Sequence, residues 1–153
     1  MSRWPRVLIG LAFVAVVGVV AVRIVTGVMP PPTLGLTEDG ELQPCPDSDN
    51  CVHSAADDER HAIEPLACDM DDLDRVVDRA VTDLDRTSVE TTDDGYAHLE
   101  ARSLVFGFVD DLELHATLGR IEVRSAARLG GDDGGVNRER VEELRASVGD
   151  ICG

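Results

Sequence analysis

The chain contains no lysine, so arginine supplies all 14 basic side chains, against 19 aspartates and 11 glutamates. Residues 30–153 carry 11 of the arginines and all 30 acids, which leaves that part with a formal charge of −19 when histidine is neutral. A field of this sign repels nucleic acid and anionic membrane surfaces, so neither is expected as a ligand. A lysine-free, aspartate-rich surface is typical of a halophilic protein adapted to concentrated salt, with arginine-biased codon usage as a partial alternative.

Aromatic residues and recognisable catalytic signatures are also scarce. One Trp, one Tyr and three Phe limit the hydrophobic core. The residues from Cys45 onward, about 110 of them, make one ordinary domain rather than two. No nucleophile elbow, P-loop, H-E-x-x-H motif or dinucleotide-binding fingerprint occurs in the sequence. The sequence therefore predicts no cofactor, and an enzyme is the less favoured interpretation.

One long apolar run is present over residues 7–28, interrupted only by Arg23. As a helix rising 1.5 Å per residue it would reach about 33 Å, enough to cross a hydrocarbon core of about 30 Å. Arg3 and Arg6 precede it, which predicts a cytoplasmic N-terminus over residues 1–6 and an external C-terminal portion. The run ends without the small-residue cleavage site of a secretory signal, which favours an uncleaved anchor over a cleaved signal peptide.

We therefore expect a single-pass protein of the cell membrane. Residues 7–28 are the predicted transmembrane anchor, residues 29–44 a Pro-rich tether or linker, and residues 45–153 an extracytoplasmic domain. Contact with the membrane is expected through the anchor.

Four cysteines, Cys45, Cys51, Cys68 and Cys152, all fall in the expected external part, and an even number there favours disulfides. They allow three pairings, which the sequence leaves open. Closing Cys45 to Cys51 would stabilise the fold by roughly 2 kcal/mol, and closing the longer loop from Cys68 to Cys152 by roughly 4.5 kcal/mol. The rival interpretation is a metal site with His53, but C-x5-C is not a zinc-ribbon spacing, and no metal is expected.

Hydrophobic periodicity predicts the elements of the domain. Helical spacing runs through residues 69–85, and a second helix is expected over residues 137–148 with Asn137 as its N-cap. Between them, four segments have the pattern of strands: residues 87–92, 96–103 and 109–117, and a last one around Ile121 and Val123. The expected fold is α+β in the order α-β-β-β-β-α: a four-stranded antiparallel meander with two helices on one face, preceded by one N-terminal transmembrane helix.

Alternation along these strands separates two faces of the sheet. Ala97, Leu99, Leu112 and Leu114 are expected in the core. The opposite face carries polar side chains: His98, Glu100, Arg102, Glu113, His115, Glu122 and Arg124. Such a face is usually hydrated and laced with weak cross-strand ion pairs, and metal binding or acid–base chemistry by its histidines is the less favoured alternative.

Several separated segments stand out in a fixed order. They are Cys45-Pro46 with Asn50-Cys51-Val52, Ile63-Glu64-Pro65, S-L-V-F-G-F-V-D-D over residues 103–111, Arg124-Ser125-Ala126 with Arg128, and Gly135-Val136-Asn137-Arg138 with Arg140-Val141. Over residues 45–148 these segments resemble the family of bacterial, archaeal and plastid proteins called domain of unknown function 1499. His53, in place of a usual serine, and Gly134, in place of a bulkier residue, depart from its pattern. The family has no established activity, so the resemblance implies a domain and leaves its function open.

The sharpest candidate for a ligand site lies at the approach to the last helix. It comprises Asp110, Asp111, Arg124, Ser125, Arg128, Asn137 and Arg138. Guanidinium forks beside the free N–H groups of a helix N-terminus suit an anion. The alternative, which we favour, is that the two aspartates pair with Arg124 and Arg128 while Asn137 caps its helix.

The leading hypothesis is a membrane-tethered, extracytoplasmic binding or interaction module without catalysis, whose partner is an unknown protein or a small anionic ligand. One alternative is an enzyme that acts on a small anionic substrate through the Arg/Asp/Asn residues, which would have to converge in a pocket. The other is a redox or metal module built on Cys45 and Cys51, which requires a reactive thiolate with His53 as its nearest activator.

The charge of the external part leads to a prediction about salt. Mutual repulsion among its carboxylates should destabilise the fold at low ionic strength and be screened near 1 M salt, where the Debye length is about 3 Å. Thermal melts across a salt series should show a rising midpoint. A midpoint that does not depend on salt would contradict adaptation to concentrated salt.

Overall fold

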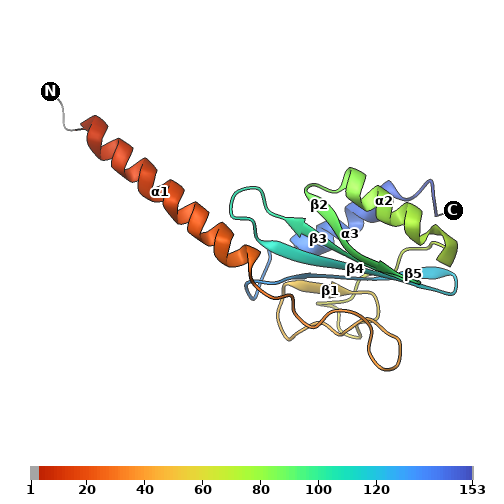
Figure 1. Cartoon of the computed structure of the whole chain (residues 1–153). Coiled ribbons are helices and arrows are strands. Elements are labelled where there is room, and N and C mark those ends of the chain that lie inside the picture. The colour runs from red at the N-terminus through yellow and green to blue at the C-terminus, as the bar shows by residue number, and fades with distance from the viewer. Residues whose placement is uncertain (1–3, 153) are drawn as a thin grey trace.

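The computed structural model describes residues 4–152; residues 1–3, with Arg3 of the expected cytoplasmic segment, and Gly153 lie outside them. A long N-terminal helix leads into a sheet with two helices packed on it (Figure 1). The elements are α1 (Trp4–Gly27), β1 (Cys51–His53), the 3-10 helix η1 (Met70–Asp72), α2 (Leu73–Asp83), β2 (Thr87–Asp93), β3 (Tyr96–Arg102), β4 (Val109–Thr117), β5 (Arg120–Ala127) and α3 (Val136–Ser147).

The sheet is antiparallel throughout and has the strand order β1-β5-β4-β3-β2. The predicted meander is confirmed as β2 to β5, but the expected number of four strands is wrong, because β1 adds a fifth at the edge. Val52 of β1 lies opposite Ser125 of β5. The strand β1 has only three residues, and all three are buried. Such a strand shows no alternation of buried and exposed residues by which the sequence could reveal it.

Helices α2 and α3 lie together on one face of the sheet, as the sequence predicts (Figure 1). The apolar stripe of α2 and the inward side chains of the strands form one core. It includes Val76, Val77, Ala80, Ala97, Leu99, Leu112, Leu114, Ile121, Val123, Val141 and Leu144. The helix expected over residues 69–85 is divided into η1 and α2.

The start of α3 differs from the expectation. Gly135, with φ of +85°, occupies the N-cap position, so Asn137 lies inside the helix and does not cap it. The Asp133 carboxylate instead accepts hydrogen bonds from the amides of Gly135 (2.8 Å) and Asn137 (2.9 Å). An acceptor two residues before the cap thus satisfies donors that the helix leaves free.

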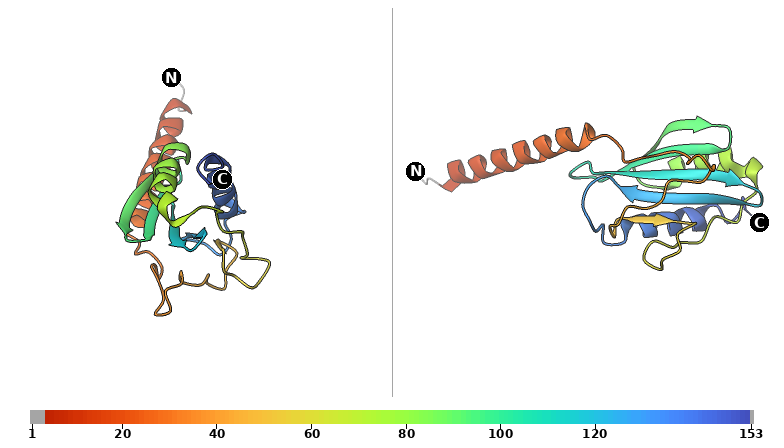
Figure 2. Two further views of the ribbon diagram at one scale, coloured as in Figure 1. Left: turned by 90° about the vertical axis from the view of Figure 1, so that its right-hand side faces the viewer. Right: turned by 90° about the horizontal axis from the view of Figure 1, so that it is seen from below.

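The other face of the sheet is covered by the chain between α1 and α2, which crosses it before entering α2 (Figure 2). Leu42 of this segment is buried, and the Gly35 amide donates to a Glu113 carboxylate oxygen at 2.7 Å. The expectation of a hydrated polar face is therefore wrong for four of its seven residues, since Glu113, Arg124, His98 and Glu100 are buried. Arg102, His115 and Glu122 keep part of their surface exposed.

Two disulfides, Cys45–Cys51 and Cys68–Cys152, select one of the three possible pairings. The first closes a short loop before β1. The second spans a sequence separation of 84 and joins the segment before η1 to the chain beyond α3. The C-terminus is thereby held beside the first helix of the domain.

Helix α1 projects away from the rest of the chain, and its large apolar side chains are exposed (Figure 1). Residues 7–27 have a mean hydropathy of 2.7 and are long and apolar enough to cross a membrane. A signal sequence near an N-terminus meets the same criterion, so length and composition alone give weak evidence for a span.

The two disulfides allow a matched comparison. Replacing Cys68 and Cys152 with alanine should lower the free energy of unfolding by about 4.5 kcal/mol, because it frees a long loop in the unfolded chain. The Cys45→Ala/Cys51→Ala variant, which frees a short loop, should lose only about 2 kcal/mol. Denaturant unfolding of the full chain in detergent measures both. Equal losses would contradict the loop-length account.

Candidate functional site

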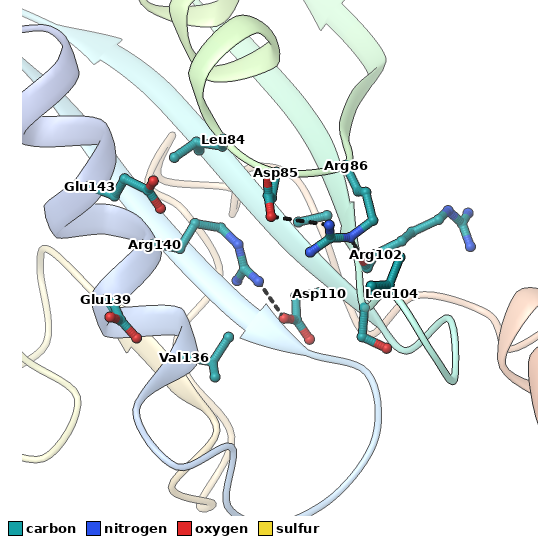
Figure 3. A pocket seen from close by; sticks show the side chains of 12 residues that line it. Leu84, Asp85, Arg86, Arg102, Leu104, Asp110, Val136, Glu139, Arg140 and Glu143 are labelled. Atoms are coloured by element: carbon teal, nitrogen blue, oxygen red, sulfur yellow. Dashed lines mark hydrogen bonds and ion pairs between the residues drawn. The ribbon is translucent and has the colours of Figure 1, made fainter.

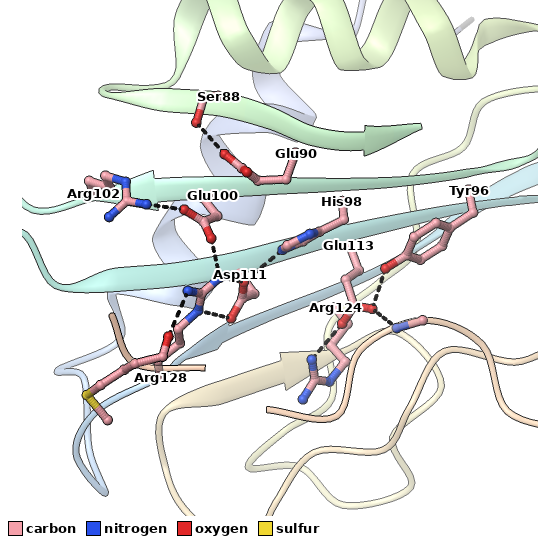
Figure 4. Close-up of polar contacts among 12 residues, drawn as sticks. Ser88, Glu90, Tyr96, His98, Glu100, Arg102, Asp111, Glu113, Arg124 and Arg128 are labelled. Atoms are coloured by element: carbon pink, nitrogen blue, oxygen red, sulfur yellow. Dashed lines mark hydrogen bonds and ion pairs between the residues drawn. The ribbon is translucent and has the colours of Figure 1, made fainter. Parts of the chain in front are cut away.

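A buried ion pair lies on the face of the sheet opposite the helices. Glu113 of β4 faces Arg124 of β5 in register, with an oxygen–nitrogen distance of 2.6 Å (Figure 4). The other carboxylate oxygen accepts from the Tyr96 hydroxyl at 2.8 Å and from the Gly35 amide. Burial and the neighbouring carboxylate raise the pKa of Tyr96, so it remains a neutral donor. Glu113 is therefore held by donors from three sides.

A second group of charges lies beside the first and centres on Asp111 (Figure 4). Arg128 donates to both Asp111 oxygens, at 2.6 and 2.9 Å, and also to Glu100. The Nε2 atom of His98 lies 2.7 Å from Asp111. Burial alone would raise the pKa of Asp111, but the hydrogen bonds from Arg128 and His98 outweigh it and hold the pKa below its ordinary value. The carboxylate is thus charged and fully partnered.

His53, the histidine considered as a metal ligand, lies in β1 and is buried. Its Nδ1 accepts from the Ala55 amide at 2.9 Å, while its Nε2 has no hydrogen-bond partner among the described residues. Burial lowers the pKa of His53, which favours the neutral ring. Cys45 and Cys51 form a disulfide, and residues 4–152 contain no group of three or more His, Cys, Asp or Glu side chains placed to hold a metal.

The predicted ligand-site residues are divided between the two faces of the sheet. Period-two alternation turns Asp110 toward α3, where it pairs with Arg140 at 2.6 Å, and turns Asp111 to the opposite face. On the α3 side, Ser125 donates to the Asn137 side chain at 2.5 Å. Arg124 lies on the other side with Glu113.

Two of the expected pairings therefore differ from the structure. Asp111 pairs with Arg128 as expected, but Asp110 pairs with Arg140 and Arg124 with Glu113. Arg138 approaches none of them, since its guanidinium donates to the carbonyls of Ala62 and Arg60. The set does not converge on one point.

An open cavity of about 280 Å³ lies between α3 and the connection from α2 to β2 (Figure 3). Its lining includes Asp85, Arg86, Leu104, Asp110, Glu139, Arg140 and Glu143. We call it the α3 cavity. Glu139 and Glu143 stand on the helix wall and Arg86 on the opposite wall, while the Arg102 guanidinium points away from the cavity (Figure 3). Burial raises the pKa of Asp110, and the ion pair with Arg140 only partly offsets it.

Arg86 has an unusual backbone. Its φ of +51° is the only positive value for a non-glycine residue among residues 4–152. Its Nε donates to the Arg102 carbonyl at 2.8 Å, and its Nη1 lies 3.1 Å from the exposed Asp85 carboxylate. Left-handed conformations of such residues cost roughly 1–2 kcal/mol and recur at functional sites.

Sequence analysis missed the α3 cavity, because its residues come from separate elements. The connection between helix α2 and strand β2 contains neither glycine nor asparagine, so no residue type in it indicated a left-handed conformation, and only the structure assigns that conformation to Arg86.

The sequence model of one family, described as "Protein of unknown function (DUF1499)", matches residues 41–148. The match includes all five strands and both helices of the domain. No curated protein and no solved structure matches the chain.

The buried pair leads to a prediction on stability. Arg124→Gln leaves the Glu113 charge buried without its cation and should lower the free energy of unfolding by about 3–5 kcal/mol. Arg75→Gln is the matched control, because Arg75 forms an exposed pair with Asp72 and should cost at most about 1 kcal/mol. Adding Glu113→Gln to Arg124→Gln should recover part of the loss. Equal effects of Arg124→Gln and Arg75→Gln in denaturant unfolding would contradict a buried pair.

Proposed function

The chain belongs to the DUF1499 family, and we propose that it is a membrane-tethered, extracytoplasmic binding module without catalytic activity. The proposed ligand site is the α3 cavity. The proposed ligand is small and polar and carries both an anionic and a cationic group.

The tether rests on α1. Residues 7–27 are apolar apart from Arg23, and the most apolar stretch of this helix is not buried against the rest of the described chain. The helix is long enough to cross a hydrocarbon core. The arginines before it support a cytoplasmic N-terminus, and two disulfides in the domain support an oxidising compartment on the other side.

The proposal of a ligand with two charges rests on the charged side chains that line the α3 cavity. Arg86, on one wall, forms an ion pair with no described residue except the exposed Asp85, so the anionic group of a ligand can replace that weak partner at small cost. Glu139 and Glu143, on the other wall, form no ion pair among the described residues and suit a cationic group. Arg140, which also stands on α3, is paired with Asp110, so the glutamates remain available to a cationic group.

The strained backbone of Arg86 supports the same site. A glycine would adopt its positive φ freely, whereas arginine retains a conformational cost. The backbone strain at Arg86 is explained if its guanidinium is required at the cavity wall to bind a ligand.

Binding is favoured over catalysis because the groups proposed for chemistry do not meet. Asp111, Arg124 and Arg128 lie on the face of the sheet away from Asp110 and Asn137, paired with one another or with neighbours. All four cysteines are in disulfides, which disfavours a redox module.

Glycine and its dimer and trimer are suitable probes, because they carry both charges at increasing separation. One of them should raise the melting midpoint of the full chain in detergent at fixed high salt, since a ligand of the folded state stabilises it. Acetate and ethylammonium, each with one charge, should have little effect. Arg86→Gln and Glu143→Gln should abolish the shift, while Arg75→Gln should retain it. A shift with acetate alone would indicate an anion site instead, and no shift with any probe would contradict the proposal.

Arg86→Gly separates a binding role from a structural one. The relief of roughly 1 kcal/mol of backbone strain should offset the lost hydrogen bond to the Arg102 carbonyl. We expect the melting midpoint without probe to be unchanged or higher, with the probe response lost. A probe response that persists in Arg86→Gly would contradict a binding role for Arg86.

A further inference from the structure

We propose that the loop between β3 and β4, residues 103–108, inserts its apolar side chains into the outer leaflet of the bilayer beside the end of α1. We call it the β3–β4 loop. The inference rests on the proposed membrane span of α1 and adds a second contact, through which the domain docks on the lipid surface.

The side chains of this loop are apolar and exposed. Leu104 is 68% exposed, Val105 53% and Phe106 43%, and Phe108 is exposed as well. The loop holds two of the three phenylalanines of a chain that is poor in aromatics, stacked with their ring centroids 5.4 Å apart. Exposed apolar side chains gathered in this way mark a surface that another apolar phase covers.

The exposed apolar surface continues beyond the loop. Leu129 and Val136 are exposed next to it and line, together with Phe108, a second cavity of about 380 Å³. The residues of the loop itself carry no charge. The uncharged loop is the part of the domain that lies against α1 (Figure 1), and Asp110, Asp132 and Asp133 complete the lining of the cavity beside it.

The contact with α1 sets the depth of the loop. Arg23 donates through one nitrogen to the carbonyls of Leu104 (2.8 Å) and Val105 (3.1 Å). Arg23 lies four residues before Gly27, the end of the apolar segment, which is about 6 Å along a helix. A loop that touches Arg23 therefore lies at the level of the last turn of the proposed span, where hydrocarbon meets the headgroups.

Part of the loop backbone is hydrogen-bonded to α1 and within the loop itself. The Thr26 hydroxyl, which is buried, lies 3.3 Å from the Phe106 carbonyl and 3.2 Å from the Gly107 carbonyl. The same hydroxyl also lies 3.1 Å from the Val22 carbonyl and 3.3 Å from the Arg23 carbonyl, so its single hydrogen serves one of these acceptors at a time. The amides of Gly107 and Phe108 bond to Ser103. Lipid penalises unsatisfied backbone groups heavily, so the contacts that Arg23, Thr26 and Ser103 make with the loop backbone favour its burial in the leaflet.

Gly107 lies beside the Arg23 side chain in a backbone conformation that favours glycine. Its φ is +68°, which other residues adopt only with strain. Arg23 in turn gains partners for a charge that would otherwise face hydrocarbon near the end of the span. The arginine that interrupts the apolar run thus joins the anchor to the loop.

Tryptophan fluorescence in lipid vesicles tests the docking. The full chain carrying Trp4→Phe, to remove its one native Trp, is reconstituted in phosphatidylcholine vesicles, because an acidic domain would be repelled by anionic lipid. Phe106→Trp, or Val105→Trp if the first does not fold, reports on the loop. Leu118→Trp is the matched control, since Leu118 is 95% exposed in the turn at the other end of β4, roughly 26 Å away at about 3.3 Å per residue.

We expect the loop reporter to show blue-shifted emission and to lose intensity in lipid brominated near the headgroup, while Leu118→Trp does neither. Phe13→Trp, in the middle of α1, should be quenched by lipid brominated near the bilayer centre. If Phe13→Trp is quenched and the loop reporter behaves like Leu118→Trp, the docking is wrong and the tether stands. If Phe13→Trp is not quenched, the proposed span itself is wrong, and the docking with it.

Arg23→Leu tests how the loop is held. This variant lengthens the apolar surface of α1 and removes the hydrogen bonds to the loop carbonyls. Quenching of the loop reporter should fall, while that of Phe13→Trp should not. Unchanged quenching of the loop reporter would overturn the inference that α1 sets its depth.

Discussion

Glu113 sits on the central part of the sheet with none of its surface exposed, and its carboxylate has to be compensated there. Arg124 supplies the opposite charge from β5, Tyr96 a hydroxyl from β3, and Gly35 an amide from the segment after α1. One buried charge thus connects three consecutive parts of the sheet with the chain that covers it. Desolvating a carboxylate is costly, so its donors have to be in place together. The covering segment is consequently a part of the packed domain.

This closure determines where ligands can be accommodated. In the sequence, the polar face of the sheet is a candidate for a binding site. In the structure, its buried charges pair with one another around Glu113 and Asp111. The α3 cavity lies on the other side, between α3, which carries Glu139 and Glu143, and the connection that carries Arg86, with the Arg140–Asp110 pair between them (Figure 3). We infer that stability and binding are assigned to opposite faces of one sheet.

The molecule also has two distinct ends. At one, the last turn of α1 bonds to the β3–β4 loop, and the α3 cavity includes Leu104 of that loop in its lining. At the other, the turn after β4 exposes Leu118, which is 95% accessible to solvent. A ligand site next to the proposed membrane contact would present the cavity to molecules at or near the lipid surface, which is consistent with a tethered binding module.

Local rules made much of this predictable from the sequence. Helical spacing identified α2 and α3, alternation identified β2 to β5 and their inward residues, and hydropathy identified α1, because each depends on neighbours along the chain. The three-residue β1, the disulfide pairing and the burial of the polar face required the tertiary structure, since each depends on segments distant in sequence. The residues predicted as one ligand site lie on two faces of the sheet for the same reason. Consecutive residues such as Asp110 and Asp111 point to opposite faces of a strand, and only the packing of α3 and the covering segment decides what each one meets.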